Sequence, residues 1–493
     1  MDDISRRLYS AAQVRELDRR AMQSGISGYA LMQRAAAACW DELRTRWPAA
    51  RRIHVVCGSG NNGGDGFEIA RLARASGCEV TAWQVGESPR AGDALTAHQA
   101  WTAGRGVTRP FATDGLKDVE VVVDALFGIG LTRAVSGAAQ AAIAAINAAH
   151  AAGAGVLAVD VPSGLDAALG NILGDAVLAD VTVTFIGDKL GLHTDSGPDC
   201  AGDVILDCLD IPSAVYEGIE PLALRLHADD LKRWLPLRAR SAHKGSNGHV
   251  LLIGGNEGMA GAILMAACAA LRAGAGLVTV ATRANHAAIL TAAQPELMCR
   301  GVETATHLLP MMESADVIAI GPGLGQDAWS RRLLARVLEC AAPLVVDADA
   351  LNLLAREPLH RSGWILTPHP GEAARLLNIR TADVQHDRAG AAAKLRESYG
   401  GVVVLKGAGS LIQGNELRLC PYGNPGMAAG GMGDVLTGIA AAFVAQGLSL
   451  EDAANAAVLA HALTGDRAAR TGQRGLLPGD LLAELRAVVN PCS

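Results

Sequence analysis

Aromatic residues, an excess of basic charge and long uninterrupted apolar segments are all lacking in this chain of 493 residues. Only 3% of the residues are aromatic although 50% are hydrophobic, and alanine supplies much of the apolar content. The net charge is −7 with both signs interspersed, so the chain offers no basic surface that would attract nucleic acid. The composition therefore predicts many closely packed helices and no nucleic-acid partner.

Targeting signals and paired cysteines are also missing. The opening segment MDDISRR has no apolar core, so we expect no signal peptide. The longest apolar stretch, GAILMAACAALRAGAGLVTVA, is interrupted by Arg272 and by glycines, which argues against a membrane span. The ten cysteines include no C-x-x-C pair and are best interpreted as reduced thiols. We therefore expect a cytoplasmic protein with no membrane partner.

Strand-like and helix-like segments alternate along most of the chain, which is long enough for two or three domains. Continuous apolar strands with helices between them predict parallel sheets that are covered on both faces. The pattern weakens between residues 209 and 232. We therefore expect an α/β, Rossmann-like three-layer domain over residues 1–215 and a second three-layer α/β domain over residues 225–493. The predicted strands lie in RIHVVC, VEVVVDALFG, GVLAVDVPSG, VTVTFIGD, GHVLLIGG, GLVTVAT, ADVIAIGPGLG, APLVVDADALN, GWILTPHPGE and GVVVLKGAGS.

Polar and glycine-rich residues gather where the strands of the first half end, which is where open parallel sheets bind ligands. GSGNNGGDG follows the first strand, and later strands end at Asp124, at Asp160 with Ser163 behind it, and near Lys189. Glycines in the first stretch would let backbone N–H groups approach a phosphate at the start of the next helix. Oxygen donors with little net charge suit a hard cation. We expect this turn to hold an anion through its backbone and a cation through its side chains.

GNNGGDG, DALFGIG, DVPSGLD and GDKLGLHT together resemble the N-terminal domain of bifunctional NAD(P)H-hydrate repair enzymes, an NAD(P)HX epimerase, over about residues 10–210. The resemblance implies that a potassium ion is held by Asn62, Asp124 and Ser163. Asp160 and Lys189 are the candidates for proton transfer, although Lys189 could instead pair with a phosphate or lie on the surface. The implied contacts to the hydrated nucleotide are Asn61, Asn62, Gly63, Gly64, Asp65, Gly128, Ile129, Gly130, Leu131, Thr132, Arg133, Ala134 and Asp160.

A second glycine-rich stretch, GNPGMAAGGMGDVLTG at residues 423–438, runs into a predicted helix. Its glycines would form an anion site of backbone N–H groups at the start of that helix. Asp434 is the only carboxylate in the loop. A carboxylate beside an anion makes chemical sense as a base that takes the proton of a hydroxyl group attacking a phosphoryl group. His369 in TPHPGE and Lys406 in VVVLKG also follow predicted strands.

HKG, GPGLG, TPHPGE, LKG and GNPGMAAGGMGD occur in the order typical of ADP- or ATP-dependent NAD(P)H-hydrate dehydratases, and residues 225–490 resemble that ribokinase-like family. The resemblance implies dehydration of the S hydrate, with ADP as co-substrate, magnesium as cofactor and Asp434 as catalytic base. The implied contacts to the hydrate are Ala262, Gly323, His369 and Asp434. Those to the adenine nucleotide are Lys406, Gly407, Ala408, Gly409, Ser410 and Gly433.

Two other functions are compatible with parts of the sequence. Small-alcohol kinases share the ribokinase-like fold with its glycine-rich loop and aspartate, and the N-terminal half could be a non-catalytic module that binds a nucleotide or a partner. TPHPGE and the fused NNGGDG domain argue against the kinase, and Asp160 with Lys189 argues against the non-catalytic module. We expect a homo-oligomer whose small-molecule partners are hydrated dinucleotides and ADP.

Overall fold

The structure is a computed structural model that describes residues 4–491, and the chain divides into two compact units, Met1–Leu224 and Arg225–Ser493. The division falls inside the stretch 209–232, where the strand–helix pattern of the sequence weakens. The first unit extends past residue 215 because Ala223 and Leu224 pair with Leu8 and Arg7. None of the helices within residues 4–491 is long and apolar enough to cross a membrane.

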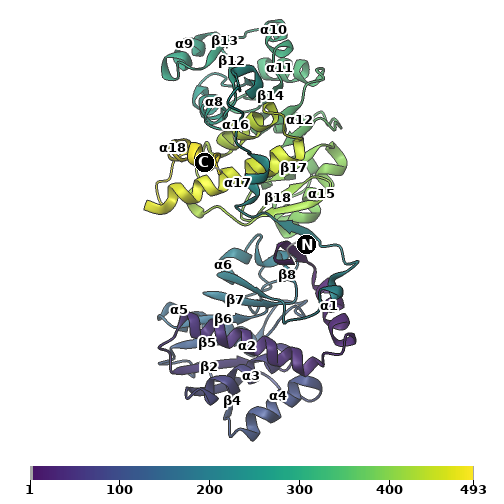
Figure 1. Cartoon of the computed structure of the whole chain (residues 1–493). Coiled ribbons are helices and arrows are strands. Elements are labelled where there is room, and N and C mark those ends of the chain that lie inside the picture. The colour runs from purple at the N-terminus through teal and green to yellow at the C-terminus, as the bar shows by residue number, and fades with distance from the viewer. Residues whose placement is uncertain (1–3, 492–493) are drawn as a thin grey trace. The chain divides into compact units, whose positions relative to one another are not determined.

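The first unit contains a parallel sheet of seven strands in the order β4-β3-β2-β5-β6-β7-β9 (Figure 1). Outside these seven strands, β1 (Arg7–Tyr9) pairs with β8 (Asp188–Lys189) in parallel and with β10 (Ala223–Arg225) in antiparallel. The seven strands are β2 (Arg52–Cys57), β3 (Glu79–Gln84), β4 (Thr108–Pro110), β5 (Val121–Ala125), β6 (Gly155–Val159), β7 (Val181–Phe185) and β9 (Asp203–Asp207).

Helices cover both faces of this sheet, as the continuous apolar strands predict. Val55 and Val123 face the core that α1, α2 and α3 complete, whereas Val56 and Val122 face the core that α5 completes. A capping box of Ser10 and Gln13 begins α1. The helices are α1 (Ala11–Gln23), α2 (Gly28–Arg46), α3 (Asn61–Ala75), α4 (Gly92–Ala103), α5 (Gly137–Ala151) and α6 (Gly197–Ala201), with 3₁₀ turns at Ile4–Arg6, Leu190–Leu192 and Ser213–Tyr216.

The sequence NNGGDG is not a turn, and this corrects the expectation drawn from its glycines. Helix α3 begins at Asn61, so only residues 58–60 connect it to β2. A Cβ atom added at Gly66 would lie 2.6 Å from the Cβ of Ala125, and one at Gly64 would lie 2.6 Å from the Cε of Met32. These glycines therefore let α3 approach the sheet and α2 closely, because any side chain there would collide.

Nine neighbouring strands of the second unit lie in the order β13-β12-β11-β14-β15-β16-β17-β18-β19 (Figure 1). The strands from β13 to β17 are parallel, and β18 and β19 add an antiparallel edge. Their bounds are β11 (His249–Ile253), β12 (Leu277–Thr282), β13 (Met298–Gly301), β14 (Val317–Ile320), β15 (Leu344–Val346), β16 (Trp364–Leu366), β17 (Val402–Leu405), β18 (Ser410–Gln413) and β19 (Leu417–Cys420).

Alanine-rich helices pack on one face of the second sheet, which agrees with the composition. Ala266 and Ala270 of α8 and Ala440 of α16 belong to one buried cluster with Val250 and Leu252 of β11. The helices are α7 (Asp230–Trp234), α8 (Ala260–Arg272), α9 (Ala284–Ala293), α10 (Leu309–Glu313), α11 (Ala328–Leu338), α12 (Ala348–Leu354), α13 (Pro370–Leu377), α14 (Thr381–His386), α15 (Arg388–Tyr399), α16 (Met432–Ala445), α17 (Leu450–Ala468) and α18 (Pro478–Val488), with 3₁₀ turns at Lys244–Asn247, Ala305–Leu308, Pro425–Met427 and Ala469–Thr471.

Each sheet reverses its strand order at one point, between β2 and β5 in the first unit and between β11 and β14 in the second. Open α/β sheets bind ligands in the crevice beyond the carboxyl ends of the strands at such a point. In the first unit this crevice lies at residues 58–60 and 126–128. In the second it lies at residues 254–259 and 321–325. The two topologies therefore predict where each unit holds its ligand.

Candidate active sites

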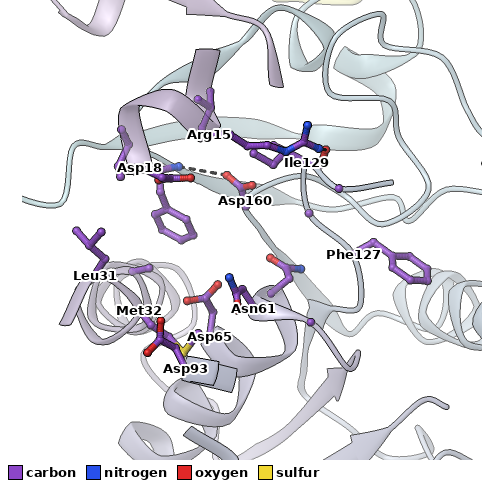
Figure 2. Close-up of a pocket in the computed structure, with 18 of the residues that line it drawn as sticks. Arg15, Asp18, Leu31, Met32, Asn61, Asp65, Asp93, Phe127, Ile129 and Asp160 are labelled. Carbon is purple, nitrogen blue, oxygen red and sulfur yellow. Dashed lines mark hydrogen bonds between the residues drawn. The ribbon is translucent and has the colours of Figure 1, made fainter. Parts of the chain in front are cut away.

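A cavity of about 710 Å³ opens at the predicted crevice of the first unit (Figure 2). Its lining contains most of the residues that the sequence assigns to the hydrated nucleotide. Gly63, Gly64 and Ala134 are not among the lining residues, because the first two face the packed side of α3. The predicted residues that line the cavity are Asn61, Asn62, Asp65, Gly128, Ile129, Gly130, Leu131, Thr132, Arg133 and Asp160.

Asp160 and Lys189 form an ion pair at the cavity, with Lys189 Nζ 2.5 Å from Asp160 Oδ1. Lys189 is fully buried and also donates to the Thr184 hydroxyl and to the Phe185 carbonyl, at 2.7 and 3.1 Å. The surface role that the sequence left open for Lys189 is therefore wrong. Because charge-assisted hydrogen bonds are the stronger ones, this lysine fixes the carboxylate of Asp160.

The backbone of Asp160 is strained. Its φ of 68° lies in the left-handed region, which costs a residue with a side chain about 1–3 kcal/mol. The Asp160 N–H donates to the Val183 carbonyl of β7 at 2.7 Å, which holds the conformation in place. The conformation turns the chain just after β6, where the Asp160 carboxylate reaches the cavity. Strain of this kind is concentrated at functional sites.

Asp124 and Ser163 lie together beside this crevice and are completely buried. The Ser163 hydroxyl donates to Asp124 Oδ1 at 2.6 Å and its backbone N–H donates to Oδ2 at 2.7 Å. Ser163 Oγ also accepts from the Phe127 N–H at 2.9 Å, so both residues support the loop that lines the cavity. Burial raises the pKa of Asp124 to about 6, and the hydrogen bonds from Ser163 oppose the shift.

Asn62 faces the same loop from α3. A Cβ atom at Gly128 would lie 3.3 Å from Asn62 Oδ1 and 3.2 Å from Asp160 Oδ2, so both side chains meet at this glycine. The Nδ2 atom of Asn62 is buried without a hydrogen-bond partner in the described part of the chain. The oxygen and nitrogen of an asparagine amide are told apart only by their hydrogen bonds, so either atom could occupy this position. A bound ligand could supply the partner that this buried atom lacks.

The three predicted potassium ligands thus provide an amide, a carboxylate and a hydroxyl group around one loop. Residues 4–491 contain no group of three His, Cys, Asp or Glu side chains that could hold a metal ion. An oxygen donor set with a single carboxylate suits a large, weakly charged cation better than zinc or a transition metal. The chemistry of these three donors therefore fits potassium. That Asn62, Asp124 and Ser163 hold the ion remains a prediction.

Besides Asp160, three further carboxylates line the cavity, those of Asp18, Asp65 and Asp93. Asp65 was assigned from the sequence, and burial followed by the charge of Asp160 raises its pKa well above the usual value. Asp18 of α1 was missed, because an aspartate within an amphipathic helix gives no sequence signal of a ligand site. Figure 2 shows Asp18, Asp65 and Asp160 directed at the same space from three different elements.

In the second unit, a buried ion pair lies at the carboxyl ends of β15 and β17. Lys406 Nζ is 2.8 Å from Asp347 Oδ1 and 3.8 Å from Glu372 Oε2. The Thr437 hydroxyl donates to Asp347 Oδ2 at 2.7 Å. Burial opposes the charge of Lys406, but the carboxylates of Asp347 and Glu372 outweigh it and raise its pKa. Burial likewise opposes the charge of Asp347, but Lys406 and the hydrogen bonds from Thr437 and Thr367 together outweigh it, so the pKa of Asp347 is lowered.

Asp434 lies in the first turn of α16, next to this ion pair. The loop before it ends at Gly431, whose φ of 94° only glycine adopts readily. A Cβ atom at Gly433 would lie 3.3 Å from Lys406 Nζ, so the loop and the lysine are neighbours. Burial raises the pKa of Asp434 to about 7, and the charge of Asp347 adds to the shift while Lys406 opposes it. A carboxyl group with this pKa can take up a proton at neutral pH.

The other predicted contacts to the hydrate, His369, Gly323 and Ala262, follow neighbouring strands or lie in the first turn of α8. His369 caps α13, accepting from the Gly371 N–H at 3.0 Å, and burial lowers its pKa. Its cap is completed by Glu372, which accepts from the His369 N–H at 2.8 Å. Gly323 has a φ of 56°, and a Cβ atom there would lie 3.1 Å from that of Ala262, so these two residues meet at the strand-order reversal.

The loop 406–410 predicted to bind the adenine nucleotide connects β17 to β18. Arg388 is buried against it and donates to the carbonyls of Lys406 and Gly409, at 3.4 and 3.3 Å. Arg388 and Asp347 are supporting residues that the sequence interpretation missed. Asp347 had a usable signal, since it directly follows the buried strand of APLVVDADALN, whereas Arg388 had none.

Comparisons with known proteins match both units. Residues 250–486 match a protein-family model described as NAD(P)H-hydrate dehydratase, and residues 28–191 match one described as YjeF-related protein N-terminus. The chain is 50% identical over 488 residues to a bifunctional NAD(P)H-hydrate repair enzyme of Coxiella burnetii, with 98% of this chain and 99% of that protein covered. It is 44% identical over 471 residues to the enzyme of the same description in Escherichia coli, with 95% and 90% covered.

The second unit also matches a solved structure. A ribokinase-like superfamily protein of Enterococcus faecalis is 34% identical in sequence and superposes with a TM-score of 0.51. The match covers 54% of this chain and 95% of that protein. The ribokinase-like fold expected for the second half is thereby confirmed.

Proposed function

Since the chain belongs to the family of bifunctional NAD(P)H-hydrate repair enzymes, we propose that each unit carries one of the two activities. The first unit interconverts the R and S hydrates of NADH and NADPH. The second unit dehydrates the S hydrate and thereby restores the reduced nucleotide. The observation that carries this conclusion is that relatives of this description match 98% and 95% of the chain, and so span both units. A small-alcohol kinase joined to an unrelated binding module would not give such matches.

Asp434 is the base of the dehydration. It accepts the proton of the hydroxyl group at C6 of the hydrated ring, and the freed oxygen attacks the terminal phosphoryl group of ADP, so that AMP leaves. The ring nitrogen then expels phosphate from C6, and loss of a proton from C5 restores the dihydronicotinamide. Hydroxide is a poor leaving group, which explains why a dehydratase uses a kinase-like fold. The pKa of about 7 supports this role, because Asp434 can hold and release a proton near neutral pH.

Lys406 and the start of α16 bind the phosphates. The ammonium group of Lys406 is held by Asp347 and lies beside Gly433, at the N-terminal end of a fourteen-residue helix. Free backbone N–H groups at a helix N-terminus and a fixed cation together suit a transferring phosphoryl group. Arg388 keeps the loop 406–410 in shape for the adenine nucleotide. Ala262, Gly323 and His369 contact the hydrate.

The nucleotide is ADP, and magnesium neutralises charge on its phosphates when it is bound. Because residues 4–491 contain no cluster of three His, Cys, Asp or Glu side chains, the ion would rely mainly on the phosphates of the nucleotide, with Asp349 as the nearby carboxylate that could hold it. ADP supports faster repair than ATP at equal concentration. This choice rests on the family resemblance, and the opposite preference would overturn it.

In the first unit, the cavity takes the hydrated nucleotide against the Asn61 end of α3 and the loop 128–134. Asn62, Asp124 and Ser163 hold potassium, which supplies positive charge beside the phosphate-facing loop. Asp160, fixed by Lys189, exchanges a proton with the C6 hydroxyl. Its short bond to Lys189 keeps the carboxylate in one position, which proton transfer requires.

The experiment that tests the whole proposal uses a mixture of R and S hydrates with ADP and magnesium. The absorbance of the restored dihydronicotinamide should account for both epimers, faster than the R hydrate epimerises spontaneously. If NAD(P)H is no longer restored once the S hydrate is exhausted, the proposed epimerase activity is wrong. If a phosphorylated alcohol accumulates and no NAD(P)H is restored, the proposed dehydratase activity is wrong. We also expect a homo-oligomer, which a mass measurement in solution checks.

A further inference from the structure

Helix α1 brings an acidic side chain to the cavity of the first unit. Asp18 lines this cavity together with Asn61, Asp65 and Asp160, and Figure 2 shows its carboxylate directed toward the same space as that of Asp160. The two carboxylates come from elements far apart in the sequence. A ligand that contacts Asp160 in this cavity would therefore also be faced by Asp18, from another side.

The helix is anchored on several sides, so the position of Asp18 is well defined. Val14 and Leu17 are buried in the core beside it. Gln13 Nε2 donates to the Glu220 carbonyl at 2.6 Å, and Arg20 donates to the Glu217 carbonyl at 2.7 Å. Arg15 donates to the Ile129 carbonyl at 3.1 Å, which joins α1 to the loop that lines the cavity.

Asp18 and Asp160 differ in how their charge is supported. Asp160 accepts hydrogen bonds from Lys189, Thr184 and the Phe185 N–H. Within residues 4–491 the carboxylate of Asp18 accepts none, although the residue is half-buried. A carboxyl group removed from water without a hydrogen bond destabilises a fold, and such groups persist mainly where they function. Burial raises the pKa of Asp18 to about 6, while Lys189 lowers it and Asp160 raises it. Asp65 of α3 also faces it and has the same sign of charge.

We propose that Asp18 is a catalytic acid of the epimerisation, paired with Asp160 as the base across the bound hydrate. This inference rests on the proposed function of the first unit. In the step we assign, Asp160 takes the proton of the C6 hydroxyl group, the bond between C6 and the ring nitrogen breaks, and Asp18 gives its proton to that nitrogen. The product is an open-chain aldehyde. After rotation about the C5–C6 bond, the nitrogen attacks the other face of the carbonyl carbon and returns its proton to Asp18. The oxygen takes its proton back from Asp160, so atoms and charges balance and both groups regain their starting states.

The test uses the full-length protein with Asp18→Asn, which keeps the size of the side chain and removes the acid. With ADP and magnesium present, repair of the R hydrate should fall by about 10²–10⁴-fold, the usual scale for an acid or base. Repair of the S hydrate should be unchanged, since it does not depend on the first unit. Asp18→Glu should retain part of the activity. Glu16→Gln is the matched control, because Glu16 lies on the same helix outside the cavity lining and pairs with Arg19 and Arg20.

The pH profile separates catalysis from a structural role. The acid form of Asp18 is lost as the pH rises through about 6, so R-hydrate repair by the wild-type protein should decline on the alkaline side. The residual activity of Asp18→Asn should lack this decline, and its thermal unfolding temperature should be no lower than that of the wild type. Wild-type rates on the R hydrate in Asp18→Asn, or an unchanged alkaline limb, would overturn the inference. If the wild-type protein itself fails to accelerate R-hydrate repair, it is the proposed function of the first unit that fails.

Discussion

Dehydration of the S hydrate should accelerate as the pH rises through about 7. Asp434 acts as a base only in its ionised form, and burial together with the charge of Asp347 raises its pKa to about 7. A single group with that pKa is roughly 10% ionised at pH 6 and roughly 90% ionised at pH 8. The rate with saturating ADP and magnesium should therefore increase about tenfold over this interval, which the absorbance of the restored dihydronicotinamide measures.

Substitutions connect this pH profile to Asp434. Asp434→Asn should lower turnover by about 10²–10⁴-fold, leave ADP binding intact and remove the rise with pH. Asp383→Asn is the matched control, because Asp383 is an exposed carboxylate that pairs with Arg380 away from the site. Near-normal turnover in Asp434→Asn, or a flat wild-type profile between pH 6 and 8, would refute the reasoning.

The buried neighbour of Asp434 supplies a second test of the same electrostatics. Asp347→Asn removes a like charge and leaves Lys406 without its closest partner, and both changes favour the ionised form of Asp434. The midpoint of the profile should therefore move to lower pH. Breaking a buried ion pair commonly costs about 3–5 kcal/mol of stability, so the profile is measured at a temperature where unfolding curves show the variant folded. A midpoint that moves upward would contradict the assignment.

Three further predictions follow from the packing and the donor sets. Gly66→Ala should destabilise the protein by about 1–3 kcal/mol in denaturant unfolding, because its Cβ atom would lie 2.6 Å from that of Ala125; Gly60→Ala, with nothing within 4 Å, is the control and should cost far less. Potassium chloride should raise the thermal stability of the wild type more than sodium chloride does. Asp124→Ala should abolish this difference, while S-hydrate dehydration continues. If the wild type responds equally to both salts, the predicted potassium site is wrong. A fragment of residues 225–493, which has its own buried core, should fold and repair only the S hydrate, and its full consumption of a racemic mixture beyond the spontaneous rate would refute the division of labour.

The strands and the places where they end could be predicted from the sequence, because parallel strands buried on both faces are continuous apolar runs. The segment VEVVVD became the wholly buried β5, and VTVTF became β7. The same reasoning located Asp160 and Lys189 at strand ends, where they form an ion pair. The sequence did not reveal β3, β4, β9 and β13, which lie at or next to the sheet edges, because their burial is incomplete and short runs with exposed positions lack the continuous apolar pattern.

Residues that reach a site from a helix, or that support it from behind, could not be found in this way. Asp18 lies in a helix whose apolar spacing explains only Val14, Leu17 and Ala21, and nothing in the sequence shows which polar side faces a cavity. Arg388 begins α15 and supports a loop eighteen residues away in sequence, through carbonyl groups that carry no side-chain signal. Such residues are determined by tertiary packing, which strand and turn patterns do not encode.

The two glycine-rich stretches show why composition alone misleads about a loop. In the second unit, Gly431 adopts a φ of 94° directly before α16, so the glycines there shape the backbone around the predicted phosphate site. In the first unit, Gly64 and Gly66 lie inside α3 in a helical conformation, and what they provide is the absence of a side chain against Met32 and Ala125. That close approach places Asn61, Asn62 and Asp65 in the lining of the cavity. Glycines therefore support both sites, by backbone conformation in one and by packing in the other, and only the neighbouring side chains distinguish the two.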